Sequence, residues 1–483
     1  MTLGELLGAE AKVSAAIAAL PVSGIAADSR QVKPGYLFAA LPGVNTDGAR
    51  FAADAVARGA VALLSSDEID AGVPVIAVPD PRRHLALIAA RYFAAQPETV
   101  VAVTGTNGKT SVAAFTRQLW SDAGYAAASL GTVGVVSPSG TKVLRHTTPD
   151  PIELHEILAS LAAESVTHLA LEASSHGLQQ RRLDGVRLKA GAFTNISRDH
   201  LDYHASFEDY FEQKLRLFSE LLPDGAAAVV DMDSAESRRV ADAALASGLN
   251  VLTVGRNGQT LRLVEVENEG FAQRLAIEHE GKRHTVLLPL VGAFQASNAL
   301  VAAGLAMATG GSADDVLPRL ADLRGATGRL DLAGTARTGA PIFVDYAHTP
   351  DALIKALDSL RPYAANRLFV VFGCGGDRDR GKRPQMGAAA ADKADVVIVT
   401  DDNPRSEDPA TIRDEILVAA PGAREIGDRT TAISEAIRML RAGDVLLVAG
   451  KGHETGQTIG TRVVPFSDHD AVAAALTRGA DFG

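Results

Sequence analysis

The sequence predicts an α/β protein of three folded units, with sheets that are largely parallel. Short β-branched runs alternate with alanine-rich helical stretches along almost the whole chain, which is the pattern of strand–helix–strand units. The chain has 483 residues, and one domain usually has about 150. A glycine-containing turn between a strand and a helix, at residues 104–111, indicates a phosphate-binding loop. We therefore expect three domains, at residues 1–97, 98–330 and 331–483.

Composition and charge exclude several other classes of protein. The formal net charge is −11, so the basic stripe of a nucleic-acid-binding protein is not expected. Cys374 is the only cysteine, which rules out an intramolecular disulfide and fits a reducing compartment. The N-terminus, MTLGELLGAE, lacks the features of a signal peptide, and no stretch approaches the roughly 18 apolar residues of a membrane span. We expect a cytoplasmic monomer without nucleic-acid or membrane partners.

The expected elements follow this alternation in chain order. In the first unit we expect strands at Tyr36–Ala40, Ala60–Leu64 and Val73–Val78, helices at Phe51–Arg58 and Arg82–Ala95, and a boundary at Pro97. The second unit has expected strands at Thr99–Val103, His168–Glu172, Lys189–Thr194 and Ala226–Asp231, followed by an alternating, more polar stretch, Val251–Leu288, that predicts antiparallel strands. The third unit predicts a doubly wound sheet with strands at Ile342–Tyr346, Arg367–Phe372, Asp395–Thr400 and Asp444–Ala449.

The loop at the start of the second unit has the residue types that phosphate binding requires. It contains Gly105, Thr106, Asn107, Gly108, Lys109, Thr110 and Ser111. Glycines let backbone N–H groups approach phosphate oxygens, a lysine can reach the β and γ phosphates, and a hydroxyl can bind Mg²⁺. Val103 stands where the general pattern has a glycine, so a βα turn that binds no ligand is the alternative.

Two further polar segments directly follow predicted strands. Glu172 ends one strand, which places a carboxylate at the sheet edge that carries the phosphate loop. The segment 195–204 follows the next strand and contains His200 and His204, which taken alone would suit solvated positions. A zinc-protease motif is excluded because no glutamate follows His200.

These segments, in this order, resemble the Mur ligase family, whose phosphate loop reads TGTNGKT as residues 104–110 do here. The resemblance covers nearly the whole chain, and folylpolyglutamate synthetases have a similar loop. It implies a three-domain α/β architecture with a P-loop ATPase-like central domain and a doubly wound, Rossmann-like C-terminal domain. It also implies that Lys109, Glu172, His200 and Lys214 are the catalytic residues.

The same resemblance implies two Mg²⁺ ions. Glu172 and His200 would bind magnesium together with a hydroxyl of Thr110 or Ser111, and a carbamate on Lys214 would help to bind a second ion. Lys214 lies beside a helical stripe that we expect to be buried, formed by Phe207, Phe211, Leu215 and Phe218. From the residues alone, an ordinary surface lysine is an equal alternative.

The remaining substrate contacts are also implied by the resemblance. Asn298, Arg329, Asp345 and His348 would complete the ATP site, although Gln295 stands where the family usually has asparagine, and residues 348–351 could equally be a helix cap. The UDP-linked precursor would contact Ser29, Asn45, Thr46, Thr147, Thr148, Ser174, Gln180 and Arg182, with His146 where asparagine is common. Taken alone, each of these segments is only a polar turn.

The segment Asp402, Asn403, Pro404 and Arg405 discriminates among amino-acid substrates. It resembles the segment with which the diaminopimelate-adding, MurE-type members recognise their substrate, and Arg378, Gly450 and Glu454 match the other contacts. An arginine suits diaminopimelate because its planar fork pairs with the extra carboxylate, which lysine lacks. An ordinary turn after a strand is the alternative.

The sequence therefore predicts an ATP-dependent ligase that adds meso-diaminopimelate to the D-Glu carboxylate of UDP-MurNAc-L-Ala-D-Glu through an acyl phosphate. Its partners would be these two substrates and ATP, and its metal Mg²⁺. The alternatives are a lysine-adding ligase, a folylpolyglutamate synthetase, another P-loop enzyme such as a GTPase or kinase, and an inactive nucleotide-binding scaffold. A synthetase would lack the N-terminal unit and residues 402–405, a GTPase would have no use for residues 345–351, and a scaffold would be expected to lose Lys109, Glu172 or His200.

Overall fold

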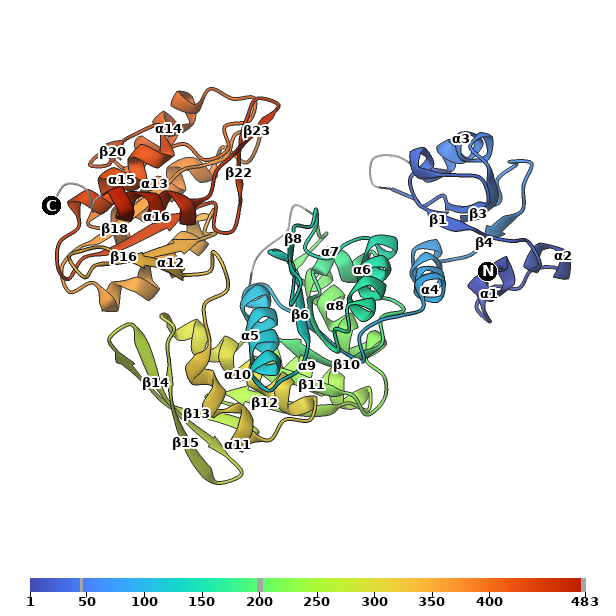
Figure 1. The fold of residues 1–483 in the computed structure, drawn as a ribbon, viewed down its shortest axis with the longest axis horizontal. Helices are drawn as coiled ribbons and strands as arrows, with labels where there is room; N and C mark the ends of the chain where they lie inside the picture. The colour runs from blue at the N-terminus through green and yellow to red at the C-terminus, as the bar shows by residue number, and fades with distance from the viewer. Residues whose placement is uncertain (44–46, 198–202, 479–483) are drawn as a thin grey trace. The chain divides into compact units, whose positions relative to one another are not determined.

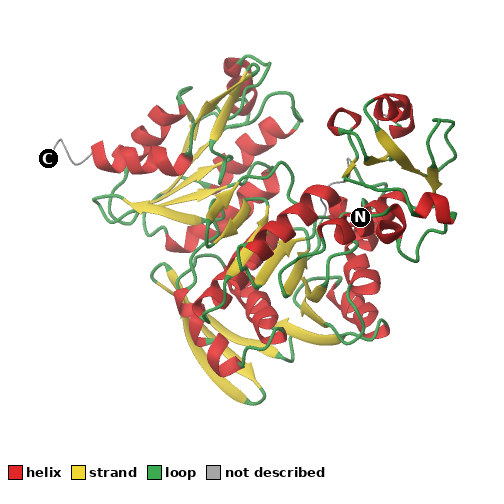
Figure 2. Cartoon of the chain, turned by 45° about the vertical axis from the view of Figure 1, so that its right-hand side comes forward, coloured by secondary structure: helices red, strands yellow, loops and turns green. Residues whose placement is uncertain are grey.

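Each of the three large sheets is covered by helices, as the alternation of strands and helices predicted (Figures 1 and 2). The structure is a computed structural model and describes residues 1–43, 47–197 and 203–478. It forms two compact units, of which the first comprises Met1–Leu263, Glu278–Arg283 and Ser297–Arg319, and the second Val264–Ile277, His284–Ala296 and Leu320–Gly483. Within the described ranges no helix is long and apolar enough to cross a membrane.

The first sheet has four parallel strands in the order β1-β2-β3-β4. One face packs on α1 and α4 and the other on α3, so the sheet is buried on both sides. The strands are Gly24–Ala26, Tyr36–Ala39, Ala60–Ser65 and Val75–Ala77, and the helices α1 to α4 are Leu3–Leu7, Ala15–Ala18, Ala52–Ala57 and Pro81–Phe93, with short turns η1 at Ser29–Gln31 and η2 at Gly48–Phe51. The predicted elements are confirmed within a few residues, whereas β1 is too short to give a sequence pattern.

The second sheet is parallel at its centre, where β10, β5, β9 and β6 lie side by side. Helices α6, α8 and α9 bury one face of it, and α5 packs on β6 and β9. The strands β5 to β12 are Thr99–Thr104, Ala127–Gly131, Gly134–Ser137, Gly140–Lys142, His168–Glu172, Leu188–Phe193, Ala227–Asp231 and Asn250–Gly255. The helices are α5 Lys109–Asp122, α6 Pro151–Ala163, α7 Ser175–Gln179, α8 Phe207–Arg216, η3 Leu217–Leu221, α9 Ser237–Ala246, α10 Ala293–Ala308, α11 Ala313–Val316 and η4 Pro318–Asp322.

The stretch expected to be antiparallel from Val251 onward begins differently. β12 runs parallel to β11, with Val251 opposite Ala228, because α9 forms a crossover connection between the two strands. β13 also joins β12 in parallel, at Val254 and Leu261. The prediction was therefore wrong for β12, while the more polar alternation does mark the long strands β13 Leu261–Glu269, β14 Ala272–His279 and β15 Lys282–Leu288.

The third sheet is doubly wound, in the order β16-β17-β21-β18-β19-β20. Only β16 is antiparallel to its neighbour β17, and helices α12, α13 and α14 cover one face while α15 and α16 cover the other. The strands β16 to β23 are Asp331–Thr335, Pro341–Asp345, Leu368–Phe372, Val396–Val399, Arg424–Glu425, Val445–Ala449, Gly456–Ile459 and Arg462–Pro465, the last two forming a separate hairpin. The helices α12 to α16 are Pro350–Leu360, Lys382–Lys393, Pro409–Leu417, Arg429–Met439 and Asp468–Arg478, and η5 is Arg361–Tyr363.

A buried ion pair fastens the two helices of one face to this sheet. Arg429, the first residue of α15, donates Nε to Asp468 Oδ1 at 2.7 Å and Nη2 to Asp468 Oδ2 at 2.8 Å. The same Nη2 donates to the carbonyl of Ala449 at the end of β21, at 2.8 Å. Both side chains have 0% exposure, so removal of either partner leaves a buried charge uncompensated.

Replacing Arg429 by alanine should lower the free energy of unfolding by about 3–5 kcal/mol, since Asp468 would remain buried without its partner. The control is Arg438→Ala in the same helix, because Arg438 is 72% exposed and pairs with Glu435 at the surface. That change should cost at most about 1 kcal/mol. Urea denaturation of the full chain followed by circular dichroism measures both, and equal losses would contradict the role of the buried pair.

Candidate active site

The phosphate loop connects β5 to α5 and passes so close to its neighbours that two positions must be glycine. Gly105 has φ 148° and Gly108 has φ 87°. A Cβ atom would stand 2.0 Å from Thr194 Oγ1 at Gly105, and 2.3 Å from Asn298 Oδ1 at Gly108. Asn298, predicted to serve the nucleotide, therefore lies directly against this loop.

The end of β10 holds the loop in place. Thr106 N donates to Asn195 O at 2.8 Å, and Asn107 N donates to Asn195 Oδ1 at 3.0 Å. Thr194 Oγ1 in turn donates to the carbonyl of Asn107 at 2.6 Å. The polar segment that follows β10 thus fixes the backbone that would contact phosphate groups.

Two lysine side chains converge on one carbonyl oxygen of the loop. Lys109 Nζ donates to Gly105 O and Thr106 O, both at 2.8 Å, and Lys214 Nζ donates to Gly105 O at 2.7 Å. Lys214 comes from α8 and is 1% exposed, so the surface-lysine alternative is wrong. The structure therefore brings both predicted catalytic lysines to the same point of the loop.

The buried stripe of α8 differs from the predicted one. Tyr210, Phe211 and Lys214 are buried, whereas Phe207 and Leu215 are only partly buried. The helix is turned toward the loop because the Tyr210 hydroxyl pairs with Thr106 Oγ1 at 3.0 Å, next to the bond that Lys214 makes. Sequence reasoning missed Tyr210, although its spacing of four residues from Lys214 places both on one helical face.

Glu172 lies at the end of β9, next to the strand that leads into the loop. Its register partner is Val103 in β5, and the side chain is 1% exposed. The carboxylate accepts from Thr132 N at 2.8 Å and from Thr132 Oγ1 at 3.1 Å. Sequence analysis did not single out Thr132.

The oxygen donors near the loop suit a hard cation. Thr110 and Ser111 lie buried in the first turn of α5, and Glu172 offers a carboxylate at the adjacent strand end. Carboxylate and hydroxyl oxygens are ligands that Mg²⁺ prefers, so these residues fit the predicted ion. His200 lies outside the described residues, and the described ones contain no group of three His, Cys, Asp or Glu side chains arranged as a metal site.

His204 is buried rather than solvated. Its Nε2 lies 2.9 Å from Ser175 Oγ and its Nδ1 lies 3.3 Å from Asp209 Oδ2. The side chain is 0% exposed and its ring packs on Tyr203 and Tyr210. The solvated alternative is therefore wrong for His204, whose contacts bind the start of α8 to α7.

Five of the predicted precursor-binding residues form one hydrogen-bonded cluster beside Glu172. Thr148 Oγ1 donates to Glu172 O at 2.8 Å and lies 3.0 Å from Ser174 Oγ. Arg182 reaches the carbonyl of Thr148 at 2.5 Å and Gln180 Oε1 at 2.7 Å. Thr147 Oγ1 joins the cluster through Thr132 Oγ1 at 3.1 Å.

The other predicted precursor contacts lie in the first sheet or outside the described residues. Ser29 is buried in the turn η1 that follows β1. Asn45 and Thr46 fall outside the described ranges. These three residues therefore stay predictions.

Three of the residues predicted to contact ATP lie around the end of β17, in the second of the two compact units. Asp345 accepts from Leu330 N and Ala347 N, both at 2.7 Å. Burial raises the pKa of Asp345, and the charge of Arg329 opposes this shift. The Arg329 guanidinium lies 5.1 Å from the Tyr346 ring centroid, which is 4.6 Å from the His348 ring. The structure thus gathers Arg329, Asp345 and His348.

Neighbouring residues explain the departure at Gln295, and a helix cap explains part of the segment at residues 348–351. Gln295 is 1% exposed and donates to the carbonyl of Arg329 at 3.3 Å, so it supports the chain next to a predicted ATP contact. Thr349 caps α12 by accepting from Ala352 N, so the capping alternative holds for this residue. His348 precedes the cap, and its ring contacts the Tyr346 carbonyl at 2.9 Å.

The predicted amino-acid site contains a buried lysine that the sequence did not lead us to assign. Lys451 is 0% exposed, and its Nζ lies 3.4 Å from Asp402 Oδ1, 3.1 Å from Asn403 Oδ1 and 3.0 Å from Glu454 Oε2. Asn403 Nδ2 also donates to Glu454 Oε2 at 2.9 Å. A Cβ at Gly450, which has φ 114°, would stand 3.4 Å from Asp402 Oδ2.

Arg405 lies next to this group and is held in a demanding backbone conformation. It has φ 51°, and its backbone pairs with Thr458 and Gly460 of the β22–β23 hairpin. Its Nη1 donates to Gly376 O at 2.7 Å. Arg378 is exposed and donates to the carbonyl of Asp377 at 3.1 Å, and Pro404 supplies the turn between Asn403 and Arg405.

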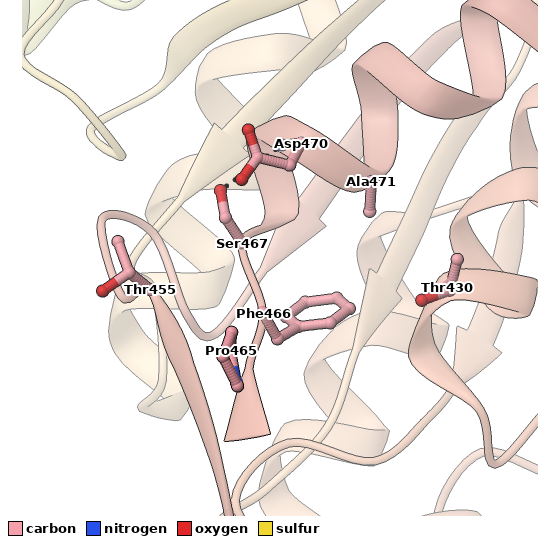
Figure 3. A pocket seen from close by; sticks show the side chains of 7 residues that line it. All are labelled: Thr430, Thr455, Pro465, Phe466, Ser467, Asp470 and Ala471. Carbon is pink, nitrogen blue, oxygen red and sulfur yellow. Dashed lines mark hydrogen bonds between the residues drawn. The ribbon is translucent and has the colours of Figure 1, made fainter. Parts of the chain in front are cut away.

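A surface pocket in the second compact unit shares no residues with the predicted amino-acid site. It is lined by Thr430, Thr455, Pro465, Phe466, Ser467, Asp470 and Ala471 (Figure 3). None of them is a predicted site residue.

Family models match most of the chain. The Mur ligase family catalytic domain matches residues 21–93, the Mur ligase middle domain residues 103–306, and the Mur ligase glutamate ligase domain residues 328–452. A UDP-N-acetylmuramoyl-L-alanyl-D-glutamate–2,6-diaminopimelate ligase from Bradyrhizobium diazoefficiens is 61% identical over 481 residues, covering 99% of both chains. A ligase of the same name from Zymomonas mobilis is 48% identical over 454 residues, covering 93% of each chain.

Solved structures agree with these family matches. A structure of a ligase with the same name has a TM-score of 0.75 at 33% identity and covers 99% of both chains. A folylpolyglutamate synthase from Mycobacterium tuberculosis has a TM-score of 0.61 at 18% identity, covering 83% of this chain and 95% of its own, which indicates a shared fold.

The chain therefore belongs to the Mur ligase family, a family of ATP-dependent enzymes that form amide bonds. The expected membership of this family and the three-domain α/β fold class are confirmed.

The glycine at position 105 provides a test of the loop geometry. Gly105→Ala should raise the Kd for ATP at least about tenfold, since the new methyl group would displace Thr194 or the loop itself. Gly124→Ala is the matched control, because Gly124 also has positive φ, 90°, but a Cβ there meets no atom within 4 Å. Calorimetric titration measures both, and wild-type affinity in Gly105→Ala would contradict a role for this loop in nucleotide binding.

Proposed function

We propose that this chain joins meso-diaminopimelate to the D-Glu carboxylate of UDP-MurNAc-L-Ala-D-Glu and cleaves ATP to ADP and phosphate. This proposal rests on the buried Asp402, Asn403 and Lys451 together with the partly exposed Glu454, beside Arg405, which offer negative and positive charge at neighbouring points. Such a site suits an amino-acid head group with one ammonium and one carboxylate. The names of the relatives at 61% and 48% identity support the same substrate.

The ATP phosphates are assigned to the loop from Gly105 to Ser111, with Lys109 released from its own carbonyls to pair with the β and γ phosphates. Asn298 would contact the nucleotide from the side of Gly108. Arg329, Asp345 and His348 are also proposed to contact ATP. The arrangement of a strand, a tight loop and a helix N-terminus supports the proposal.

The precursor is assigned to the cluster beside Glu172. Thr147, Thr148, Ser174, Gln180 and Arg182 present hydroxyl, amide and guanidinium groups that can bind its sugar and peptide oxygens, and Ser29, Asn45 and Thr46 would contact its UDP end. This assignment brings the acceptor carboxylate close to the end of β9. That strand is the neighbour of the one that carries the phosphate loop.

The metal is assigned to Glu172, His200 and the hydroxyls of Thr110 and Ser111, with a carbamate on Lys214 for a second Mg²⁺. Lys214 is buried and donates to the Gly105 carbonyl that Lys109 also reaches, so it lies at the phosphate loop, where such a ligand would be needed. When bound, Mg²⁺ would neutralise charge on the transferring phosphoryl group.

In the proposed reaction, a carboxylate oxygen of the acceptor attacks the γ-phosphorus of ATP, and ADP leaves. The diaminopimelate amine then attacks the acyl carbon of the resulting acyl phosphate, and phosphate leaves with the amide formed. Lys109 stabilises the negative charge of the phosphoryl group during the first step. No side-chain nucleophile of the protein is required.

The domain limits, location and oligomeric state belong to the same proposal. We assign precursor binding to residues 1–97, ATP binding to residues 98–330 and amino-acid binding to residues 331–483. The protein would act as a monomer in the cytoplasm, where its nucleotide-linked substrates are made, without a nucleic-acid or membrane partner.

The test of the function is phosphate release from ATP in the presence of UDP-MurNAc-L-Ala-D-Glu, with meso-diaminopimelate compared with L-lysine. Release should depend on the acceptor and on diaminopimelate, with kcat/KM for lysine lower by at least about 100-fold, because an unpaired Arg405 costs a buried charge contact. Preference for lysine would refute the substrate assignment. Lack of release with either amino acid would refute the proposed reaction.

Replacing Lys214 by alanine should lower ligation at least about 100-fold, and short carboxylic acids should restore part of it by supplying the missing oxygen ligand. Wild-type protein in ¹³C-bicarbonate should show a carbamate carbon by NMR that the variant lacks. Thermal unfolding controls for the loss of a buried side chain. Unimpaired turnover of Lys214→Ala, or rescue by none of the acids in a folded variant, would contradict the carbamate.

A further inference from the structure

The amino-acid site contains a positive charge that has no obvious partner on the substrate. A diaminopimelate head group needs one cation for its carboxylate, which Arg405 provides, and one or more acceptors for its ammonium. Lys451 is an additional cation, completely buried, at 3.4 Å or less from the side chains of Asp402, Asn403 and Glu454. A buried lysine costs free energy unless its contacts offset the loss of hydration.

We infer that Lys451 is the positioning residue that sets the charge of the amino-acid site and thereby its preference for a zwitterionic head group over a lone ammonium. This inference rests on the proposed function. Lys451 acts through Asp402, Asn403 and Glu454, whose polar atoms it contacts directly, and does not itself need to touch the substrate.

The formal charges of the amino-acid site are balanced when Lys451 is included. Asp402 and Glu454 supply two negative charges, and Lys451 and Arg405 supply two positive charges, so these four formal charges cancel. Arg378, the other predicted contact with a positive charge, is exposed and donates to the carbonyl of Asp377, so it stands outside this group. The nearby Arg429 does not alter this balance because it is paired with Asp468. A neutral group of four matches the second head group of diaminopimelate, whose ammonium and carboxylate also cancel. The side chain of lysine carries an ammonium alone and would leave the site with an excess positive charge.

The geometry gives Lys451 a second effect on the same residues. Its ammonium lies between the loop after β19, which contains Asp402 and Asn403, and the loop after β21, which contains Glu454. Asn403 uses its amide nitrogen for Glu454 and its amide oxygen for Lys451 and the backbone N–H of Thr458. Without the ammonium, the two carboxylates would repel each other and the Asn403 orientation would lose a partner.

Three variants separate the effect of the Lys451 charge from the space that its side chain fills. The quantity to measure is the ratio of kcat/KM for meso-diaminopimelate to kcat/KM for L-lysine. Lys451→Met keeps an unbranched side chain but leaves the site with excess negative charge, so the ratio should fall about tenfold or more. Lys451→Arg keeps the charge and should retain most of the ratio. Glu454→Gln leaves excess positive charge and should raise the ratio, although turnover with both amino acids falls.

The KM for ATP should stay within about twofold of wild type in all three variants, since the Lys451 ammonium contacts Asp402, Asn403 and Glu454 and none of the predicted ATP-site residues. Equal losses with both amino acids in Lys451→Met, with no rescue by arginine, would overturn the inference and leave a structural role. If Lys451→Met does not fold by circular dichroism, Glu454→Gln decides, because a lower ratio there contradicts the charge balance. Wild-type protein that uses neither amino acid refutes the proposed function itself, whereas a wild-type preference that survives in Lys451→Met refutes only this inference.

Discussion

The carbonyl oxygen of Gly105 is the point on which the central site depends. It accepts hydrogen bonds from Lys109 of the loop and from Lys214 of α8, so one backbone atom ties the phosphate loop to a helix more than a hundred residues further along the chain. The close approach of Thr194 to Gly105 fixes the same residue from the side of β10. A nucleotide that draws Lys109 away from this carbonyl would therefore remove one of two competing cations.

In the second compact unit, the predicted amino-acid site also depends on charged side chains that lie close together. There the charges of Asp402, Glu454, Lys451 and Arg405 are brought together at the carboxyl ends of β19 and β21. A parallel sheet gathers its strand ends at one edge, so residues that are about fifty positions apart in the sequence become neighbours. The fold brings the four side chains together, while the balance of their charges determines which ligand leaves the site electrically neutral. Arg405 adopts φ 51° here, a conformation uncommon for a residue with a side chain, and the pairing of its backbone with the hairpin maintains it.

Much of the fold was predictable because the strands are short, apolar and separated by turns. His168–Glu172 was predicted with its observed limits, and the alternation of strands and helices gave the parallel and doubly wound sheets. β12 was not assigned its parallel pairing, because a polar alternating sequence does not distinguish a strand reached by a crossover helix from a hairpin strand. The stripe of α8 was displaced because the polar Tyr210 and Lys214 are buried by contacts with the loop, which hydrophobic periodicity does not register.

The candidate site was predictable where a motif has a fixed backbone role, and less so where a residue acts through its neighbours. The two loop glycines, Glu172 and residues 402–405 follow from such motifs. Thr132 and Lys451 were not assigned, since their importance lies in hydrogen bonds to Glu172 and to Asn403 that join distant segments. The roles of all these site residues stay predictions, and His200, Asn45 and Thr46 lie outside the described residues.

In the proposed reaction, the acceptor carboxylate is phosphorylated and an amine then attacks the acyl phosphate. This can be tested by labelling the D-Glu side-chain carboxylate of UDP-MurNAc-L-Ala-D-Glu with ¹⁸O and analysing the released phosphate by mass spectrometry. We expect phosphate that carries one ¹⁸O atom from the acceptor. Phosphate without label, formed at the rate of amide formation, would contradict it.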